Sequence, residues 1–239
     1  MIPYIVINGK PSNIINGLLI QTLPPISKPK MRTSIEEIDG RDGDIVTTLG
    51  YAAYDKQFAI GLHGQFDIND IISFFNTSGT IIFSNEPDKL YNFATYEQID
   101  FAKLVRFKTA NVKLHVQPFK YDANEKAKVY TYAAGTTSAT ITARNNGNIY
   151  SKPTLSITGT GTIYVYINGV QQFTIELPST STEIILNAAT MNAYDNAGNF
   201  LNRLVTGDYS KLILQPNLNE LTVSGNITQL SIVNVSRWI

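Results

Sequence analysis

The sequence contains no cysteine, and its 19 basic and 19 acidic residues leave it with no net charge. The absence of cysteine excludes disulfide bonds, thiolate metal ligands and a cysteine nucleophile, and it is typical of proteins that fold in a reducing cytoplasm. Proteins that bind nucleic-acid phosphates normally carry an excess of basic residues, because counterion release drives that binding. The charge balance therefore disfavours specific nucleic-acid recognition.

Long apolar runs are also missing. No stretch approaches the roughly 18 consecutive apolar residues that a membrane-spanning helix needs, so we expect no membrane association. The opening segment, MIPYIVINGKPSN, lacks a basic region followed by an apolar one, and we expect no secretory signal.

Residue patterns for catalysis or cofactor binding are missing as well. The two histidines, His63 and His115, have neither the spacing of a metal site nor a neighbouring nucleophile motif. The segments GTTSAT and TGTGT lack the lysine of a phosphate-binding loop. We therefore expect no catalytic residue, no metal and no cofactor, and we predict that the protein is not an enzyme.

One acidic stretch, EEIDGRDGDI at residues 36–45, raises a choice between a metal loop, paired catalytic carboxylates and a charged turn. A calcium-binding loop needs acids at alternate positions and ends on a bidentate glutamate, where the count from Asp39 reaches Gly50. Glu36 and Glu37 are adjacent, so on a strand their side chains point to opposite faces. The stretch therefore fits neither kind of site.

We interpret this stretch as the tight turn of a hairpin. Its strands are expected at residues 31–39 and 44–50. Gly40 and Gly43 supply backbone conformations that other residues adopt only at a cost in free energy, and aspartate stabilises turns through its own side-chain hydrogen bonds. Arg41 and Asp42 then lie at the tip of a projecting hairpin, either as solvated charge or as a docking point for a neighbouring subunit.

The rest of the chain is predicted to be mainly β. Charged residues make up 16% of the sequence, and its 13 tyrosines suit sheets that partners cover. One helix stands out in DINDIISFFN, where Asp67 can cap the N-terminus. Its apolar stripe is expected to consist of Ile68, Ile71, Ile72 and Phe75. NVKLHVQPF alternates apolar and polar residues, the pattern of a half-buried strand.

The composition changes after Tyr121, where the charged linker DANEKAK leads into a segment with turn signals at intervals of about ten residues. That spacing predicts a β-sandwich. In TIYVYINGVQQFTIEL two strands flank the turn Asn168-Gly169, and Tyr164 and Tyr166 share one face. We place the boundary near residues 122–130 and predict two domains, residues 1–125 and 126–239.

Several motifs follow one another in a characteristic order. MRTSIEEIDGRDGDIVTTLGYAAYDKQFAI, the single helix and LVRFKTANVKLHVQPFKY make up the first half. NNGNIYSKPTLSITGTG, YINGV, SKLILQPNLNELTVSG and the terminal SRWI follow in the second. This order resembles the distal tail (Dit) proteins of long, flexible-tailed bacteriophages. One departure is Gln215-Pro216-Asn217, because the family often has Pro-Gly-Asn there.

The resemblance implies both a fold and a role. It implies an N-terminal β-sandwich-like domain with one helix and a projecting hairpin, which forms a homohexameric ring, alone or stacked as a dodecamer. C-terminal galectin-like β-sandwiches project outward. Such a ring joins the tail-tube protein to the tail-tip hub protein, supports receptor-binding or baseplate proteins in many phages, and lets DNA pass through its channel. The implied location is the virion tail tip, after assembly in the host cytoplasm.

A closed ring repeats one heterologous interface, so a hairpin that reaches onto the next subunit is an economical contact. We therefore expect an oligomer interface at the hairpin. Its candidate residues are Arg32, Gly40, Arg41, Asp42 and Gly43.

Two other functions remain open. A carbohydrate-binding module could recognise the host cell wall through the C-terminal sandwich, with Tyr164, Tyr166 and Trp238 as a stacking surface. The same aromatic residues are equally useful against other virion proteins. A wall hydrolase is the third reading, and the absence of any catalytic motif counts against it.

Overall fold

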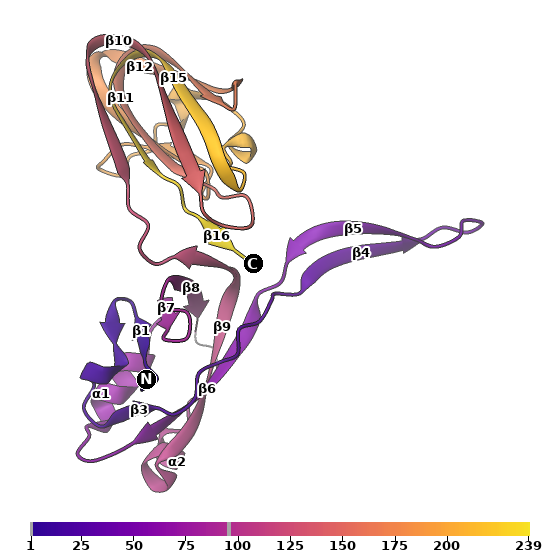
Figure 1. The fold of residues 1–239 in the computed structure, drawn as a ribbon, viewed down its shortest axis with the longest axis vertical. Helices are drawn as coiled ribbons and strands as arrows, with labels where there is room; N and C mark the ends of the chain where they lie inside the picture. The colour runs from indigo at the N-terminus through magenta and orange to yellow at the C-terminus, as the bar shows by residue number, and fades with distance from the viewer. Residues whose placement is uncertain (1, 95–96) are drawn as a thin grey trace. The chain divides into compact units, whose positions relative to one another are not determined.

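The computed structural model describes residues 2–94 and 97–239 (Figure 1). Strands take up 58% of the structure and helices 10%, so the predicted mainly β class is confirmed. The chain divides into two compact units. One ends at Ala123 and also takes in Ile239, and the other covers Asn124–Trp238. Within the described ranges, no helix is both long and apolar enough to cross a membrane.

The N-terminal unit is built on one antiparallel sheet with the strand order β2-β1-β7-β8-β9-β6-β3. Its strands are β1 (Ile5–Ile7), β2 (Lys10–Pro11), β3 (Leu18–Ile20), β6 (Tyr54–Leu62), β7 (Gly79–Phe83), β8 (Lys89–Ala94) and β9 (Thr109–Asp122). A short 3-10 helix, η1 (Ser12–Ile14), follows β2. The Asn8-Gly9 turn between β1 and β2 has positive φ at both residues, as a tight hairpin turn requires.

Along β9, buried apolar side chains alternate with polar ones, so one face of the sheet packs against the core. Val112, Leu114 and Val116 are fully buried, whereas the lysine and histidine between them are not. The strand thus has the predicted half-buried pattern. The aromatic rings of Phe58, Phe83 and their neighbours meet edge to face in the same core, an arrangement that aromatic pairs favour.

The predicted helix is confirmed as α1 (Ile68–Phe75). Its cap is Asp67, whose carboxylate accepts a hydrogen bond of 2.8 Å from the backbone N–H of Asn69. The buried side chains are Ile71, Phe74 and Phe75, so the stripe differs from the predicted one at Ile72, which is 36% exposed. Phe74 packs against the core instead of Ile72, because the buried face of α1 contains residues 71, 74 and 75.

A second helix, α2 (Phe101–Phe107), corrects the expectation of a single helix in the N-terminal domain. Asp100 caps it by accepting from the N–H of Lys103 at 2.8 Å. Only Leu104 within it is buried. With one buried residue in two turns, the helix has no apolar period that the sequence could reveal.

The C-terminal unit is also antiparallel, with the strand order β10-β15-β11-β12-β13 and β14 paired to β12. Its strands are β10 (Lys128–Asn145), β11 (Thr154–Ile167), β12 (Val170–Asn187), β13 (Asn192–Tyr194), β14 (Val205–Gly207), β15 (Asn217–Val233) and β16 (Arg237–Trp238). Two 3-10 helices, η2 (Asn202–Leu204) and η3 (Tyr209–Lys211), lie between them.

The long strands of this unit curl around a single core. Register shifts interrupt β11 between Gly159 and Gly161, and the partner strands are interrupted at the same level. Buried side chains lie before the interruption at Leu155 and Ile157 and after it at Ile163 and Val165, and all belong to one core cluster. Gly159 makes the close strand approach possible, since a Cβ there would lie 2.4 Å from the carbonyl oxygen of Asn226.

Candidate functional site

The most exposed element of the N-terminal unit is the hairpin of β4 (Met31–Glu37) and β5 (Asp44–Tyr51). The two strands form a sheet of their own, and every residue of β4 is exposed. Figure 1 shows them leaving the N-terminal sheet as a separate ribbon. An isolated two-stranded ribbon is at best marginally stable in water. A hairpin of this kind therefore suggests a surface that a partner completes.

The turn of the hairpin has the predicted form. Glu37 pairs with Asp44, and the N–H of Arg41 donates to the carbonyl of Ile38 at 3.1 Å. Gly40 and Gly43 have φ values of 82° and 75°, a region that favours glycine. The described residues contain no cluster of three or more potential metal ligands.

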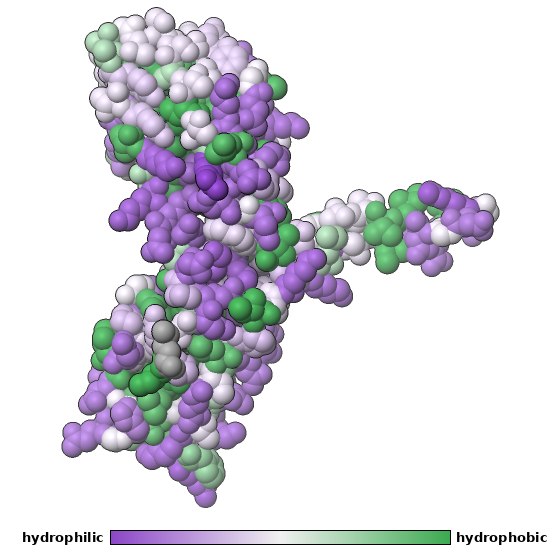
Figure 2. Space-filling view, viewed as in Figure 1, coloured by the Kyte–Doolittle hydropathy of each residue, from purple (hydrophilic) through white to green (hydrophobic). Residues whose placement is uncertain are grey.

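One face of the hairpin carries apolar side chains in the open. Directly opposed residues share a face, and here Ile35 faces Val46 across the ribbon. They are 60% and 59% exposed. Met31 lies on the same face and is also exposed. Figure 2 shows the apolar colour on the ribbon just before its tip and the hydrophilic colour at the tip itself. Contiguous exposed apolar groups of this kind are typical of interaction surfaces.

The hairpin is attached through a root, which we define as residues 21–30 and 52–56. On the side of the sheet, the N–H of Gln21 donates to the carbonyl of Ala59 at 2.8 Å. On the side of the hairpin, the N–H of Ala52 donates to the carbonyl of Lys30 at 2.8 Å. Between these points lie Pro24 and Pro25, which have no N–H to donate. The ladder of backbone hydrogen bonds is therefore interrupted at the root.

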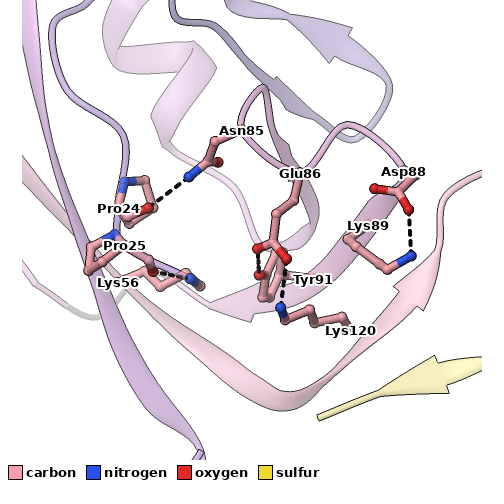
Figure 3. Close-up of polar contacts among 9 residues, drawn as sticks. All are labelled: Pro24, Pro25, Lys56, Asn85, Glu86, Asp88, Lys89, Tyr91 and Lys120. Atoms are coloured by element: carbon pink, nitrogen blue, oxygen red, sulfur yellow. Dashed lines mark hydrogen bonds and ion pairs between the residues drawn. The ribbon is translucent and has the colours of Figure 1, made fainter. Parts of the chain in front are cut away.

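Where the ladder of backbone hydrogen bonds stops, side chains donate hydrogen bonds to the carbonyls of the two prolines, as Figure 3 shows. The ammonium of Lys56 donates to the carbonyl of Pro25 at 3.0 Å, and the amide of Asn85 donates to the carbonyl of Pro24 at 3.0 Å. Lys56 is only 3% exposed. Because it belongs to β6, its hydrogen bond ties the strand that leaves the hairpin to the segment that enters it.

Aromatic rings surround the ammonium of Lys56. Its nitrogen lies 4.8 Å from the ring centroid of Tyr91, 5.6 Å from that of Phe83 and 5.7 Å from that of Tyr54. Such rings attract a cation through their quadrupoles. Burial nevertheless dominates and lowers the pKa of Lys56 to about 8, against a raising effect of Glu86.

A buried ion pair lies beside this cage. The ammonium of Lys120 is 2.6 Å from a carboxylate oxygen of Glu86, and both side chains are largely buried. The other oxygen of Glu86 accepts a hydrogen bond from the hydroxyl of Tyr91, whose pKa is raised by burial. The carboxylate is thus satisfied on both oxygens, as a buried charge requires.

The first residue beyond the root also fixes the hairpin. The ring of Tyr51, at the end of β5, packs edge to face against Phe119 of β9 at a centroid distance of 5.6 Å. This contact holds the base of the hairpin against the sheet at a point away from the proline gap.

The two predicted sets of site residues lie in different units. Arg32 is exposed at the base of the hairpin, where its guanidinium donates to the carbonyl of Leu49 at 3.3 Å. Gly40, Arg41, Asp42 and Gly43 form the tip. In the C-terminal unit, Tyr164 is 38% exposed and Tyr166 is half-buried on the outer side of β11, while Trp238 is half-buried on β16.

The motifs and periodic patterns of the sequence do not single out Lys56. The sequence does contain a signal for this lysine. It occupies an inward position of β6 between Tyr54 and Phe58, where the alternation of buried and exposed residues predicts an apolar side chain. A lysine on the buried face of a strand marks a polar contact that must be satisfied inside the protein.

No family model and no curated protein matches the sequence. Solved structures do share its fold. The SPP1 Dit (gp 19.1) protein, described as a paradigm of the hub adsorption apparatus in phages that infect Gram-positive bacteria, is 15% identical, with a TM-score of 0.68 over 100% of both chains. A chain of the phage p2 baseplate in its activated conformation with Sr is 10% identical, with a TM-score of 0.50 over 97% of both. The chain therefore has the fold of a phage distal tail protein, as the resemblance implies.

The depressed pKa of Lys56 predicts a pH dependence of stability. Between pH 8 and the usual lysine pKa of about 10.5, the unfolded chain binds more protons than the folded one, so the free energy of unfolding rises with pH. We expect a rise of about 2 kcal/mol from pH 7.5 to 9.5. Urea denaturation at both pH values measures it.

Two variants test the assignment to Lys56. Lys56→Arg keeps the charge but does not titrate in this range, so the rise should disappear. Lys10→Met changes an exposed lysine and should leave the rise intact. A rise of unchanged size in Lys56→Arg would show that another group causes it.

Proposed function

We propose that this chain is a structural virion protein that forms a ring at the distal end of a phage tail, as one hexamer or as two stacked hexamers. The observation that carries the proposal is the likeness in fold to the SPP1 Dit protein over the whole of both chains. The exposed hairpin supports it, because an unpartnered ribbon with apolar side chains in the open suits a contact with another subunit.

In this role the ring joins the tail-tube protein to the tail-tip hub protein, carries baseplate or receptor-binding proteins, and leaves a channel for DNA. The N-terminal domain forms the ring, and the C-terminal domain, as a galectin-like sandwich, faces outward. The absence of net charge supports a conduit, since a basic excess would hold the DNA that must pass. The protein acts by assembly in the virion and catalyses no reaction.

The interface of this ring includes the hairpin. Arg32 at its base and the tip residues Gly40, Arg41, Asp42 and Gly43 contact the neighbouring copy. Support comes from their exposure and from the absence of any recorded ion pair for Arg32, Arg41 and Asp42 within the described residues.

The purified protein is expected to form rings with a central hole in negative-stain electron micrographs. Light scattering should give a mass of six or twelve copies, because a heterologous interface closes only when the ring is complete. A monomer at every concentration, or particles without a hole, would contradict the proposal.

Replacing the exposed apolar pair should weaken the ring. Ile35→Thr with Val46→Thr keeps two β-branched residues in the ribbon and removes apolar contact area. We expect association to weaken about tenfold per interface, with an unchanged fold of the separate subunit. Sedimentation velocity measures the change.

The matched control is Val129→Thr with Val170→Thr, which alters two valines of similar exposure in the C-terminal unit. It should assemble like the wild type. If association weakened equally in both double variants, the loss would not be specific to the hairpin, and the hairpin would not be part of the interface.

A carbohydrate-binding function is the second candidate. The observation that favours it is the exposed ring of Tyr164 with Tyr166 beside it on one strand face. Trp238, the third predicted residue, lies on another strand, β16. If the sandwich recognises a wall glycan, the full chain should bind wall polysaccharides, and Tyr164→Ala should weaken binding about tenfold. A glycan array with no signal for the wild type would eliminate this function.

A further inference from the structure

We propose that the acidic tip of the hairpin binds the basic root of the next copy of this chain, so that opposite charges set the register of a head-to-tail contact. The acidic tip is defined as residues 36–44. The basic root patch is defined as Lys28 and Lys30 of the root together with Arg32, the second residue of β4. The inference rests on the proposed ring and identifies the surface that receives the hairpin.

Charge is segregated along the hairpin. The tip has five acidic side chains and one arginine, a net charge of −4: Glu36, Glu37, Asp39, Arg41, Asp42 and Asp44. The root patch has three basic side chains, and no acid occurs from residue 22 to residue 35. The one acid in the other segment of the root, Asp55, pairs with Lys113 and His115. All nine charged side chains of the tip and the root patch are exposed.

The tip is not neutralised within its own copy. Glu37 and Asp44 are directly opposed across the ribbon, and like charges in that position repel. Among the described residues, none of the acids of the tip takes part in an ion pair. The ribbon therefore carries an uncompensated negative end into solvent.

The root patch of the same copy does not pair with that end. Its nearest member, Arg32, is four residues from Glu36 on β4, a span of about 13 Å, whereas charges in physiological salt are screened beyond about 8 Å. Within the part of the chain that the structure describes, no ion pair joins the patch to the tip. The apolar face with Ile35 and Val46 lies between the two charged ends. A second copy that lies along the ribbon can meet both charged ends.

Tip and root are different surfaces, so the contact between them is heterologous. Each bound copy still offers one free tip and one free root, and such a series closes into a ring when the rotation from copy to copy adds up to a full turn. The apolar face supplies contact area, while the charges steer encounter and exclude other registers. An antiparallel pair of hairpins related by a two-fold axis would use both ends at once and stop at a dimer.

Two charge-reversed variants test this contact. The first carries Asp39→Lys, Asp42→Lys and Asp44→Lys, so that both its tip and its root are basic. The second carries Lys28→Glu, Lys30→Glu and Arg32→Glu, so that both are acidic. Each alone should associate at least about tenfold more weakly than the wild type. An equimolar mixture should assemble again, because each acidic surface meets a basic one in an alternating ring.

Sedimentation velocity of the full-length chains gives the readout, and a melting curve for each variant checks its fold. If the tip variant melts early, the neutral set Asp39→Asn, Asp42→Asn and Asp44→Asn replaces it and should also weaken association. The control is Lys128→Glu, Arg144→Glu and Arg203→Glu, which makes the same charge change as the root variant on exposed residues of the C-terminal unit. It should assemble like the wild type.

The possible outcomes are distinguishable. Restored assembly in the mixture, with a mass of six or twelve copies, supports the proposal. Normal assembly of either reversed variant alone, or folded variants that stay apart when mixed, overturns the charge contact and leaves the ring in place. A wild type that stops at a dimer overturns the head-to-tail arrangement, and a wild type that stays monomeric overturns the ring as well.

Discussion

The position of the hairpin depends on how the protein bridges a gap in its backbone hydrogen bonding. Pro24 and Pro25 remove two amide donors where the chain passes from the sheet into the ribbon. Lys56 supplies the missing donor from the opposite strand, at the cost of burying an ammonium group. The rings of Tyr54, Phe83 and Tyr91 reduce that cost. A ribbon held this way can project from the sheet with a defined direction.

A projecting ribbon is useful only if something covers it. On its own it exposes the apolar pair Ile35 and Val46, leaves strand edges unpaired and places Glu37 against Asp44. Each of these features is unfavourable for an isolated subunit. All three become favourable or neutral when a neighbouring copy supplies apolar surface and basic residues. The same features therefore argue for an assembly whose subunits are incomplete when separate.

The sequence predicts those parts of the fold that follow from local chemistry. Gly40 and Gly43 mark the hairpin turn because few other residues adopt its backbone, and Asp67 with the apolar period marks α1. Local patterns could not reveal α2, whose only buried residue is Leu104. Nor could they reveal the cage around Lys56, because Phe83 and Tyr91 reach it from other strands. The sequence thus predicts the hairpin, but the contacts of Lys56 that orient the hairpin depend on the tertiary structure.

Amide hydrogen exchange in the hairpin tests most directly whether neighbouring copies complete it. In the assembled wild-type particle, the outward-facing amides of residues 31–51 should exchange much more slowly than in the separated, folded charge-reversed variants. Amides of the buried strand β9 should exchange equally slowly in both and serve as the internal reference. If the hairpin exchanges at the same fast rate in the particle and in the separate chain, no neighbour covers it and the central claim is wrong.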